Sequence, residues 1–408
     1  MAVAGPLPSN LSHRFAQVSL TLQGPTGAPL ADQAVTLGQV RHKFLVGCNA
    51  FRLGSGATVQ LEQDYRDRFA QLCNYATLPF YWGAYEAHVD EPHAVPLRCM
   101  AHWCCEHGIA VKGHPLCWHE VVPKWLSGKS PQEVAARQME RIGRDVAAFA
   151  GWVDTWDVIN ESVAMPEYQR DTNPIAALCH RLGRHELITQ VFARARQANP
   201  KARLLINDYD LLEEYERIIE ECLGSGVSID AIGLQAHMHR GYMGAERIGR
   251  VCDRFARLGK PLHFTELTLL SGALKTDEDW HKVRTDWPST AEGEARQAQQ
   301  AEDIYRTLFG HKAVEAVTWW DLSDAGAWQG APAGLIRADM TPKPAYEALL
   351  RLFKQEWWTG PLELRTDQTG TVRFEGFLGD YTAQAAGGQA KFTLDKPGLV
   401  QAKATLSS

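Results

Sequence analysis

The sequence lacks several features that would assign it to a specialised class of protein. It contains no run of about 18 apolar residues, so it predicts no membrane-spanning helix. Basic residues are not in excess, because 42 Lys and Arg stand against 48 Asp and Glu, a formal net charge of −6. This balance argues against nucleic acid or an anionic membrane as a partner. Repeats and low-complexity segments are also absent, and 45% hydrophobic residues among 408 are typical of a globular protein.

Targeting and metal-binding patterns are equally scarce. The opening residues MAVAGPLPSNLSHRF show no basic region followed by a long apolar stretch, so we expect no signal peptide in this chain. Its location stays open: secreted or periplasmic if a leader was removed, and cytoplasmic otherwise. Nine cysteines are an odd number without paired zinc-finger spacing, which favours free thiols over a disulfide framework or a structural metal. We predict neither a cofactor nor a metal.

Eight short apolar runs alternate with helix-like stretches through the middle of the chain. Such alternation indicates parallel β/α units, and the count of eight favours a closed (β/α)₈ TIM barrel of the α/β class over an open doubly wound sheet. The predicted strands are LVGCNAF (45–51), YATLPFYW (75–82), IAVKGHPLCW (109–118), TWDVINE (155–161), RLLIND (203–208), AIGLQAHM (231–238), PLHFTEL (261–267) and AVTWWDL (316–322). The clearest helical segments are 131–151, 186–200 and 295–310.

Both ends of the chain have a different pattern. Residues 13–45 and 361–408 contain short runs in which apolar and polar residues alternate, separated by Gly, Pro and Asp turns, as in a β-sandwich. Two N-terminal strands alone could not bury a core. We therefore expect residues 1–44 and 357–408 to form one small β-sandwich-like module beside a catalytic barrel of residues 45–356.

Polar or tryptophan residues stand at nearly every predicted strand end, where barrel enzymes carry their active sites. Two of them, Glu161 and Glu266, follow or end strands four and seven. Across a barrel mouth, two such acids can divide the work of glycosidic cleavage, one protonating the departing oxygen and one meeting the anomeric carbon. A separation of about 5–5.5 Å would favour direct attack and retention of configuration. Either glutamate alone could equally be a solvated loop residue.

At this point the sequence resembles glycoside hydrolase family 10, whose typical activity is endo-β-1,4-xylanase. The matching segments are GHPLCWH (113–119), WDVINES (156–162), LLINDYD (204–210), IDAIGLQAHMH (229–239), FTEL (264–267) and VTWWDLSDAGAW (317–328). The resemblance implies a retaining hydrolase that acts on xylan or xylo-oligosaccharides by double displacement, with Glu161 as acid/base and Glu266 as nucleophile.

The resemblance also implies roles for the surrounding residues. Asn160 would bind the 2-hydroxyl of the attacked sugar, and His237 would hydrogen-bond the nucleophile. The remaining predicted substrate-binding residues are Asn49, His114 and Trp118 with Gln235 nearby, Trp320 and Trp328 as the roof, and Asn207 on the leaving-group side.

Two departures from the family pattern stand out. After strand two, Pro79, Phe80 and Gly83 replace a Glu-Asn pair and a Lys that usually grip the next sugar out. We expect Tyr81, Trp82 and Glu86 to substitute, with an altered glycon preference. Thr268 replaces the usual acid two places after the nucleophile, which changes the support of His237, and Val121 replaces a frequent Gln.

Other functions remain open. An exo-acting or differently specific β-glycosidase would use the same barrel. A metal-dependent hydrolase could use His237 and His239 with Asp208 or Asp324. An idle carbohydrate-binding protein, with Trp357 and Trp358 as a stacking platform, is a third possibility.

Overall fold

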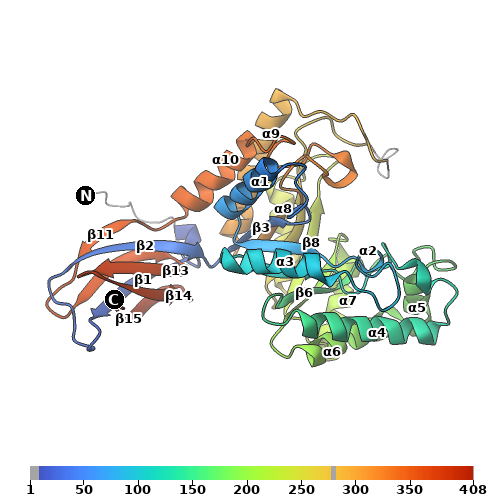
Figure 1. Ribbon diagram of the computed structural model, residues 1–408, viewed down its shortest axis with the longest axis horizontal. Coiled ribbons are helices and arrows are strands. Elements are labelled where there is room, and N and C mark those ends of the chain that lie inside the picture. Colours follow the sequence, from blue (N-terminus) through green and yellow to red (C-terminus); the bar gives the residue numbers. More distant parts are fainter. Residues whose placement is uncertain (1–8, 277–281, 408) are drawn as a thin grey trace. The chain divides into compact units, whose positions relative to one another are not determined.

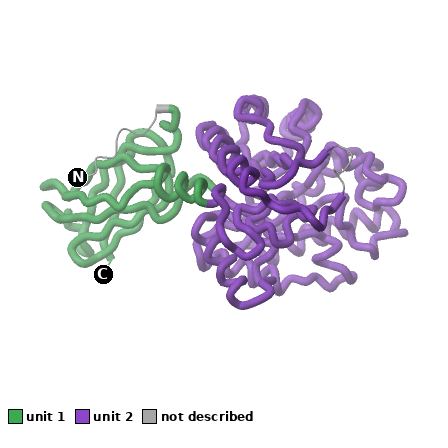
Figure 2. The backbone as a smooth tube through the Cα atoms, turned by 90° about the horizontal axis from the view of Figure 1, so that it is seen from above, with its two compact units in different colours: residues 1–45, 347–408 green, residues 46–346 purple. Residues whose placement is uncertain are grey.

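The computed structural model describes residues 9–276 and 282–407, which divide into two compact units (Figure 2). One unit comprises residues 46–346, and the other comprises residues 1–45 together with 347–408. The C-terminal division lies ten residues before the expected one. Residues 1–8, part of the predicted N-terminal segment and of the stretch considered for a signal peptide, lie outside the described residues. Within the described part of the chain, none of the helices has the length and apolar character that crossing a membrane requires.

The larger unit is built around a closed barrel of eight parallel strands, in the order β10-β3-β4-β5-β6-β7-β8-β9. Figure 1 labels β3, β6 and β8 of this barrel together with the helices beside them. This closure confirms the predicted (β/α)₈ barrel and rules out the open sheet. The strands are β3 (Leu45–Asn49), β4 (Tyr75–Pro79), β5 (Ala110–His114), β6 (Thr155–Asn160), β7 (Arg203–Asp208), β8 (Ala231–His237), β9 (Leu262–Thr268) and β10 (Val314–Trp319).

The helices follow the barrel strands in the chain. They are α1 (Val59–Leu72), α2 (Trp82–Tyr85), α3 (Ala94–Glu106), α4 (Pro131–Ala148), α5 (Pro174–Leu182), α6 (Arg184–Ala198), α7 (Glu213–Gly224), α8 (Ala245–Ala256), α9 (Ala291–Gly310) and α10 (Pro344–Arg351). Local sequence explains where they start. At α4, for example, the Ser130 hydroxyl accepts from the Glu133 amide while the Glu133 carboxylate accepts from the Ser130 amide, which satisfies two otherwise unpaired donors.

The smaller unit is a two-sheet sandwich made from both ends of the chain, as predicted. One sheet has the order β12-β1-β15 and the other β11-β2-β13-β14. Its strands are β1 (Phe15–Gln23), β2 (Ala34–His42), β11 (Leu362–Arg365), β12 (Thr371–Phe377), β13 (Gly379–Ala385), β14 (Gly388–Leu394) and β15 (Gly398–Thr405).

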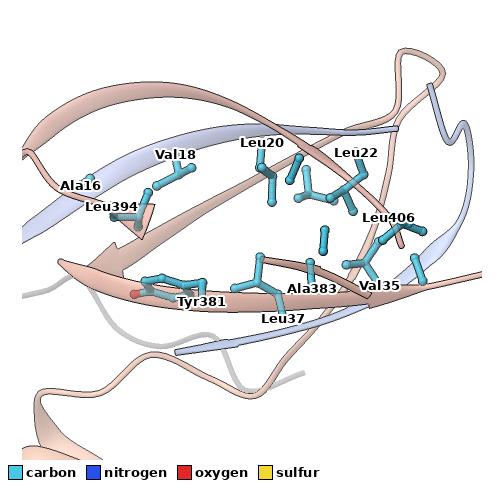
Figure 3. Packing of buried hydrophobic residues seen from close by; sticks show 14 of the residues in the cluster. Ala16, Val18, Leu20, Leu22, Val35, Leu37, Tyr381, Ala383, Leu394 and Leu406 are labelled. Carbon is cyan, nitrogen blue, oxygen red and sulfur yellow. The ribbon is translucent and has the colours of Figure 1, made fainter. Parts of the chain in front are cut away.

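The sandwich core comes from alternate residues of these strands. In β1, Ala16, Val18, Leu20 and Leu22 are all buried, as the period-two pattern predicts (Figure 3). β1 is the middle strand of its sheet, because it pairs antiparallel with β12 and parallel with β15. The N-terminal strand therefore requires two C-terminal partners.

Candidate active site

Glu161 and Glu266 lie at the carboxyl ends of β6 and β9. Glu161 has a φ of +56°, a left-handed conformation that non-glycine residues seldom adopt and that is concentrated at functional sites. Its backbone amide donates to the Asn207 carbonyl at 2.8 Å, so the end of β7 holds this turn. Glu266 is only 4% exposed.

Three buried amide side chains connect the two carboxylates. Asn207 Nδ2 donates to Glu266 Oε1 at 2.9 Å and to Asn160 Oδ1 at 2.7 Å. Asn160 Nδ2 then donates to Glu161 Oε1 at 3.2 Å. Gln235 Nε2 is shared between Asn160 Oδ1 and Glu161 Oε1, at 3.2 and 3.3 Å. The structure thus gathers residues from β6, β7, β8 and β9 around one site.

Asn207 does not lie where the family resemblance suggested. It is fully buried, and its Oδ1 accepts from the Thr265 hydroxyl at 2.6 Å. With both ends of its amide engaged inside the barrel, Asn207 positions Asn160 and Glu266 rather than facing a leaving group.

The surroundings push the pKa values of the two acids apart. The pKa of Glu161 is raised to about 8, chiefly by burial and also by the charge of Glu266, although the hydrogen bond from Trp118 acts to lower it. Burial also acts to raise the pKa of Glu266, but His114, His237 and Lys112 outweigh it and hold that pKa below its usual range. Near neutral pH, one acid therefore carries a proton while the other is ionised.

A buried chain of charged and polar groups leads from Lys112 to Glu266. Lys112 Nζ donates to Asp157 Oδ2 at 2.6 Å, and His114 Nδ1 lies 2.8 Å from the same oxygen. His114 Nε2 is in turn 3.9 Å from Glu266 Oε1. Lys112 and Asp157 were missed at the sequence level, although a charged residue inside an otherwise apolar strand is a signal that could have found them.

His237 bridges the nucleophile candidate and Thr268. Its Nε2 lies 3.1 Å from Glu266 Oε2 and its Nδ1 lies 2.9 Å from Thr268 Oγ1. The threonine hydroxyl can donate to Nδ1, which leaves the proton on Nε2 to point at Glu266. A neutral hydroxyl thus orients the ring where the family pattern has an acid.

The predicted aromatic residues surround these groups. Trp118 Nε1 donates to Glu161 Oε2 at 2.9 Å. The Trp320 ring packs edge-on against His114 and His237, with centroids 5.5 and 5.9 Å apart. Trp328, which is 39% exposed, lies over His237 with a centroid distance of 4.7 Å.

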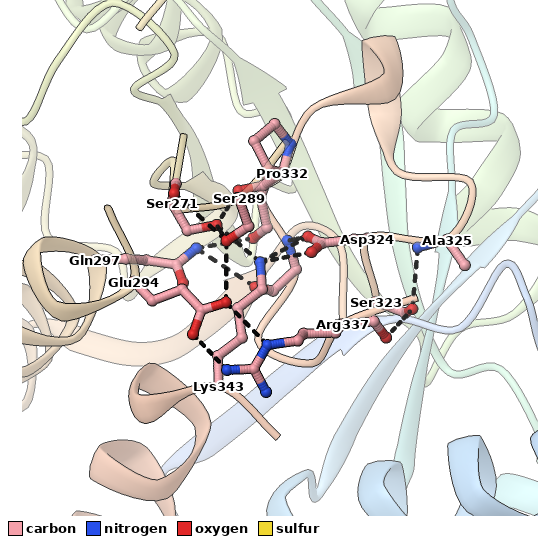
Figure 4. Close-up of polar contacts among 12 residues, drawn as sticks. Ser271, Ser289, Glu294, Gln297, Ser323, Asp324, Ala325, Pro332, Arg337 and Lys343 are labelled. Atoms are coloured by element: carbon pink, nitrogen blue, oxygen red, sulfur yellow. Dashed lines mark hydrogen bonds and ion pairs between the residues drawn. The ribbon is translucent and has the colours of Figure 1, made fainter. Parts of the chain in front are cut away.

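A polar network anchors the loop that carries Trp320 and Trp328 (Figure 4). The buried Lys343 ammonium binds Asp324 at 2.7 Å and donates to the Ser271 hydroxyl at 2.9 Å. Asp324 also accepts from the Gly334 amide at 2.8 Å. These contacts connect the segments that follow β9 and β10, so Asp324 serves the loop.

Of the three residues expected to replace the usual glycon contacts, the structure brings only Tyr81 to the site. Its ring packs against His114 and Trp118, both at 5.5 Å. Trp82 and Glu86 instead belong to a buried cluster beside α4.

That cluster uses the polar atoms of both residues. Trp82 Nε1 donates to Glu86 Oε2 at 2.9 Å, and Arg144 clamps the Glu86 carboxylate at 2.9 and 3.0 Å. Trp82 also packs against Trp125 and the Arg141 guanidinium. These contacts differ from the expected contact with substrate. The Glu86 carboxylate is paired with the Arg144 guanidinium, and it stabilises the fold.

Asn49 is buried at the end of β3, where it reveals a third acid that sequence reasoning did not single out. Its Nδ2 donates to Asp321 Oδ1 at 3.3 Å, and the Trp328 amide donates to Asp321 Oδ2 at 3.1 Å. Burial raises the pKa of Asp321 to about 6. An acid directly after two tryptophans at a strand end was the available signal.

The metal alternative has limited support. His237, one of the two histidines proposed for it, is engaged with Glu266 and Thr268. Within the described residues, His119, Glu120 and Glu161 could hold an ion, since their ligand atoms lie within 4.8 Å of one another. Such an ion would be bound by the Glu161 carboxylate, the same group that is expected to act as acid/base.

The sequence model of glycosyl hydrolase family 10 matches residues 82–352. The chain belongs to this family. Both Glu161 and Glu266 lie inside the matched region.

Curated relatives are similar over part of the chain. An endo-1,4-beta-xylanase/feruloyl esterase of Xylanibacter ruminicola is 29% identical over 57% of this chain, which spans only 35% of that protein. Endo-1,4-beta-xylanase B of Paenibacillus barcinonensis is 27% identical over 69% of this chain and 86% of that protein.

Solved structures agree in fold. Xylanase 10B of Thermotoga petrophila, crystallised with xylobiose, has a TM-score of 0.64 at 24% identity, covering 77% of this chain and 95% of that one.

Proposed function

We propose that this family 10 member is a retaining glycoside hydrolase that cleaves β-1,4-linked xylan or xylo-oligosaccharides by double displacement. The observation that carries the proposal is the pairing of a protonated Glu161 with an ionised Glu266 through the Asn207–Asn160 hydrogen bonds. The relatives named as endo-1,4-beta-xylanases favour a xylan-like substrate.

The geometry suggests how each step proceeds. Glu161 gives its proton to the departing glycosidic oxygen while Glu266 attacks the anomeric carbon and forms a covalent glycosyl ester. Glu161, now ionised, takes a proton from water, which attacks the ester and releases the sugar with its original configuration. His237 and Asn207 hold Glu266 in place by their hydrogen bonds. His114, Trp118 and Trp320 line the subsite of the attacked sugar, and Asn160 contacts its 2-hydroxyl.

Two variants test the assignment. Glu161→Ala should abolish hydrolysis of xylo-oligosaccharides but spare aryl xylosides with activated leaving groups, and azide should partly restore its turnover by attacking the glycosyl ester. Glu266→Ala should lose turnover on both substrates. Glu167→Ala, which removes an exposed acid from the same loop, is the matched control and should keep wild-type rates.

The stereochemical course provides an independent test. NMR of the first product formed from a β-xyloside should show the β-anomer. An α-anomer, or wild-type turnover by Glu266→Ala, would contradict double displacement at Glu266.

A further inference from the structure

A continuous series of aromatic rings closes one side of the site. Starting from Glu161, the series runs through Trp118 to Tyr81, then to Phe51 and on to Trp320. The successive ring centroids are 5.5, 5.6 and 5.5 Å apart, a spacing at which rings are in contact. We call these four rings the aromatic wall.

The aromatic wall connects the two catalytic candidates. At one end, Trp118 donates to Glu161 at 2.9 Å. At the other, Trp320 packs against His237, whose Nε2 lies 3.1 Å from Glu266. The four rings follow β10, β3, β4 and β5, which are neighbouring strands of the barrel, and each ring contacts the next.

Tyr81 is held firmly in the middle of this wall. The preceding residue, Phe80, is fully buried against Phe149 and Trp156, with centroids 4.9 and 4.7 Å apart. Since successive side chains of an extended segment point to opposite sides, anchoring Phe80 outward directs Tyr81 inward. Two residues after Tyr81, the Gly83 backbone amide donates to the Val121 carbonyl at 2.6 Å, an approach that a Cβ at position 83 would obstruct.

The opposite arc is polar and partly open. β7 and β8 supply Asn207 and Gln235, and Tyr209, directly after β7, is 52% exposed. The arc of β7 and β8 thus presents polar side chains to the two glutamates, whereas the arc of the aromatic wall presents rings.

A buried acid, Asp321, directly follows Trp320 of the aromatic wall. Asp321 is 8% exposed, and among the described residues each of its oxygens accepts one hydrogen bond, so acceptor capacity remains. A terminal sugar offers a free 4-hydroxyl proton to such a carboxylate. An internal β-1,4-linked sugar has an ether oxygen at that position and cannot donate.

From these observations we infer that the protein removes single sugar units from the non-reducing ends of β-1,4-xylo-oligosaccharides, with Tyr81 as the residue that closes the glycon side. The inference rests on the proposed function and specifies its substrate as chain ends.

The wild-type protein provides the first test. Xylotetraose labelled at its reducing end should give labelled xylotriose and free xylose as first products. The same tetraose, methylated at the terminal O4, should be cleaved at least 100-fold more slowly. Labelled xylobiose or xylose as first product, or equal cleavage of the methylated substrate, would overturn the inference while leaving the proposed function intact. If neither the tetraose nor an aryl xyloside is hydrolysed, it is the proposed function that fails.

Variants then test Tyr81 itself. Tyr81→Ala should open the wall, so that labelled xylobiose appears among the first products and the penalty for O4-methylation falls at least tenfold. Tyr81→Phe keeps the ring and should retain the single-unit pattern. A Tyr81→Ala variant that folds, as judged by its circular dichroism, yet keeps the wild-type pattern would show that Tyr81 does not close the glycon side.

Discussion

At the scale of single residues, Glu161 and Glu266 differ more in environment than in chemistry. Both are buried, yet Glu266 faces His114 and His237, and the strongest support of Glu161 is the neutral Trp118 indole. Burial without compensating positive charge favours the protonated form of Glu161, whereas the hydrogen bond from His237, the nearby His114 and the Lys112 ammonium favour the ionised form of Glu266. Which glutamate serves as the acid and which as the nucleophile therefore depends on the side chains that surround each one.

This division predicts the pH dependence of kcat/KM. The reactive form needs protonated Glu161, whose pKa is about 8, and ionised Glu266, whose pKa lies below its usual range. Activity on xylo-oligosaccharides should therefore fall above about pH 8 and persist to pH values below the ordinary carboxyl range. In Glu161→Gln, assayed with an activated aryl xyloside, the alkaline limb should disappear, because no proton is donated. A limb that persists unchanged would assign it to another group.

Thr268 predicts a second effect at this scale. Thr268→Val removes the hydroxyl that orients His237, and a hydrogen bond between neutral groups contributes about 0.5–1.5 kcal/mol. We expect kcat to fall about 2- to 10-fold with KM little changed, because the ring holds Glu266 rather than the sugar. Thr268→Ser, which keeps the hydroxyl, is the control and should restore most of the rate. Steady-state kinetics on an aryl xyloside measure both constants, and a change confined to KM would argue for a substrate contact.

At the scale of elements, loops rather than strands give the site its rim. Trp320 and Trp328 follow β10, and the Lys343–Asp324–Ser271 contacts hold their loop against the segment after β9. An ammonium that is fully buried depends on these partners. The roof of the site is thus positioned by an ion pair outside it.

We expect this ion pair to dominate the stability of the loop. Asp324→Asn leaves the Lys343 charge buried without its counterion, which should lower the free energy of unfolding by about 3–5 kcal/mol. Arg250→Ala, which removes an exposed pair with Glu246 on α8, should change it by less than about 1 kcal/mol. Urea unfolding followed by tryptophan fluorescence compares the two. Equal small losses would mean that the Lys343 pair is not a stabilising anchor.

At the scale of the whole molecule, the candidate site lies within one of the two units. Every candidate site residue lies in residues 46–346, whereas β1 completes a sandwich core formed with the C-terminal strands. A cavity in that core should weaken the sandwich and leave the chemistry of the barrel unaltered.

Leu20→Ala tests this separation. The Leu20 side chain is fully buried in the sandwich, so its truncation should cost about 2–5 kcal/mol of stability. We expect calorimetry to show a lower Tm for the sandwich while kcat/KM of the folded protein stays within twofold of wild type. Ser19→Ala, at the neighbouring position on the opposite face of β1, is the control. A large loss of kcat/KM would show that the sandwich supports catalysis.

Much of this organisation could be predicted because it depends on short-range patterns. Apolar runs such as RLLIND form buried strands wherever they occur, period-two alternation gives the sandwich its inner face, and a polar residue at a strand end belongs to the barrel mouth. Glu161, Glu266 and their amide neighbours followed from such rules together with the family motifs.

The roles of Trp82, Glu86, Asn207 and Asp321 depended on tertiary contacts. Glu86 was expected to contact substrate, but Arg144 from α4 pairs with it. Asp321 was not singled out, and its contact with Asn49 from the neighbouring strand β3 is seen only in the folded barrel. Local sequence determined the strands, the helix starts and the two acids. Only the closed barrel decided which charges are paired, which acid keeps its proton and where the aromatic wall lies, since those depend on groups brought together from distant segments.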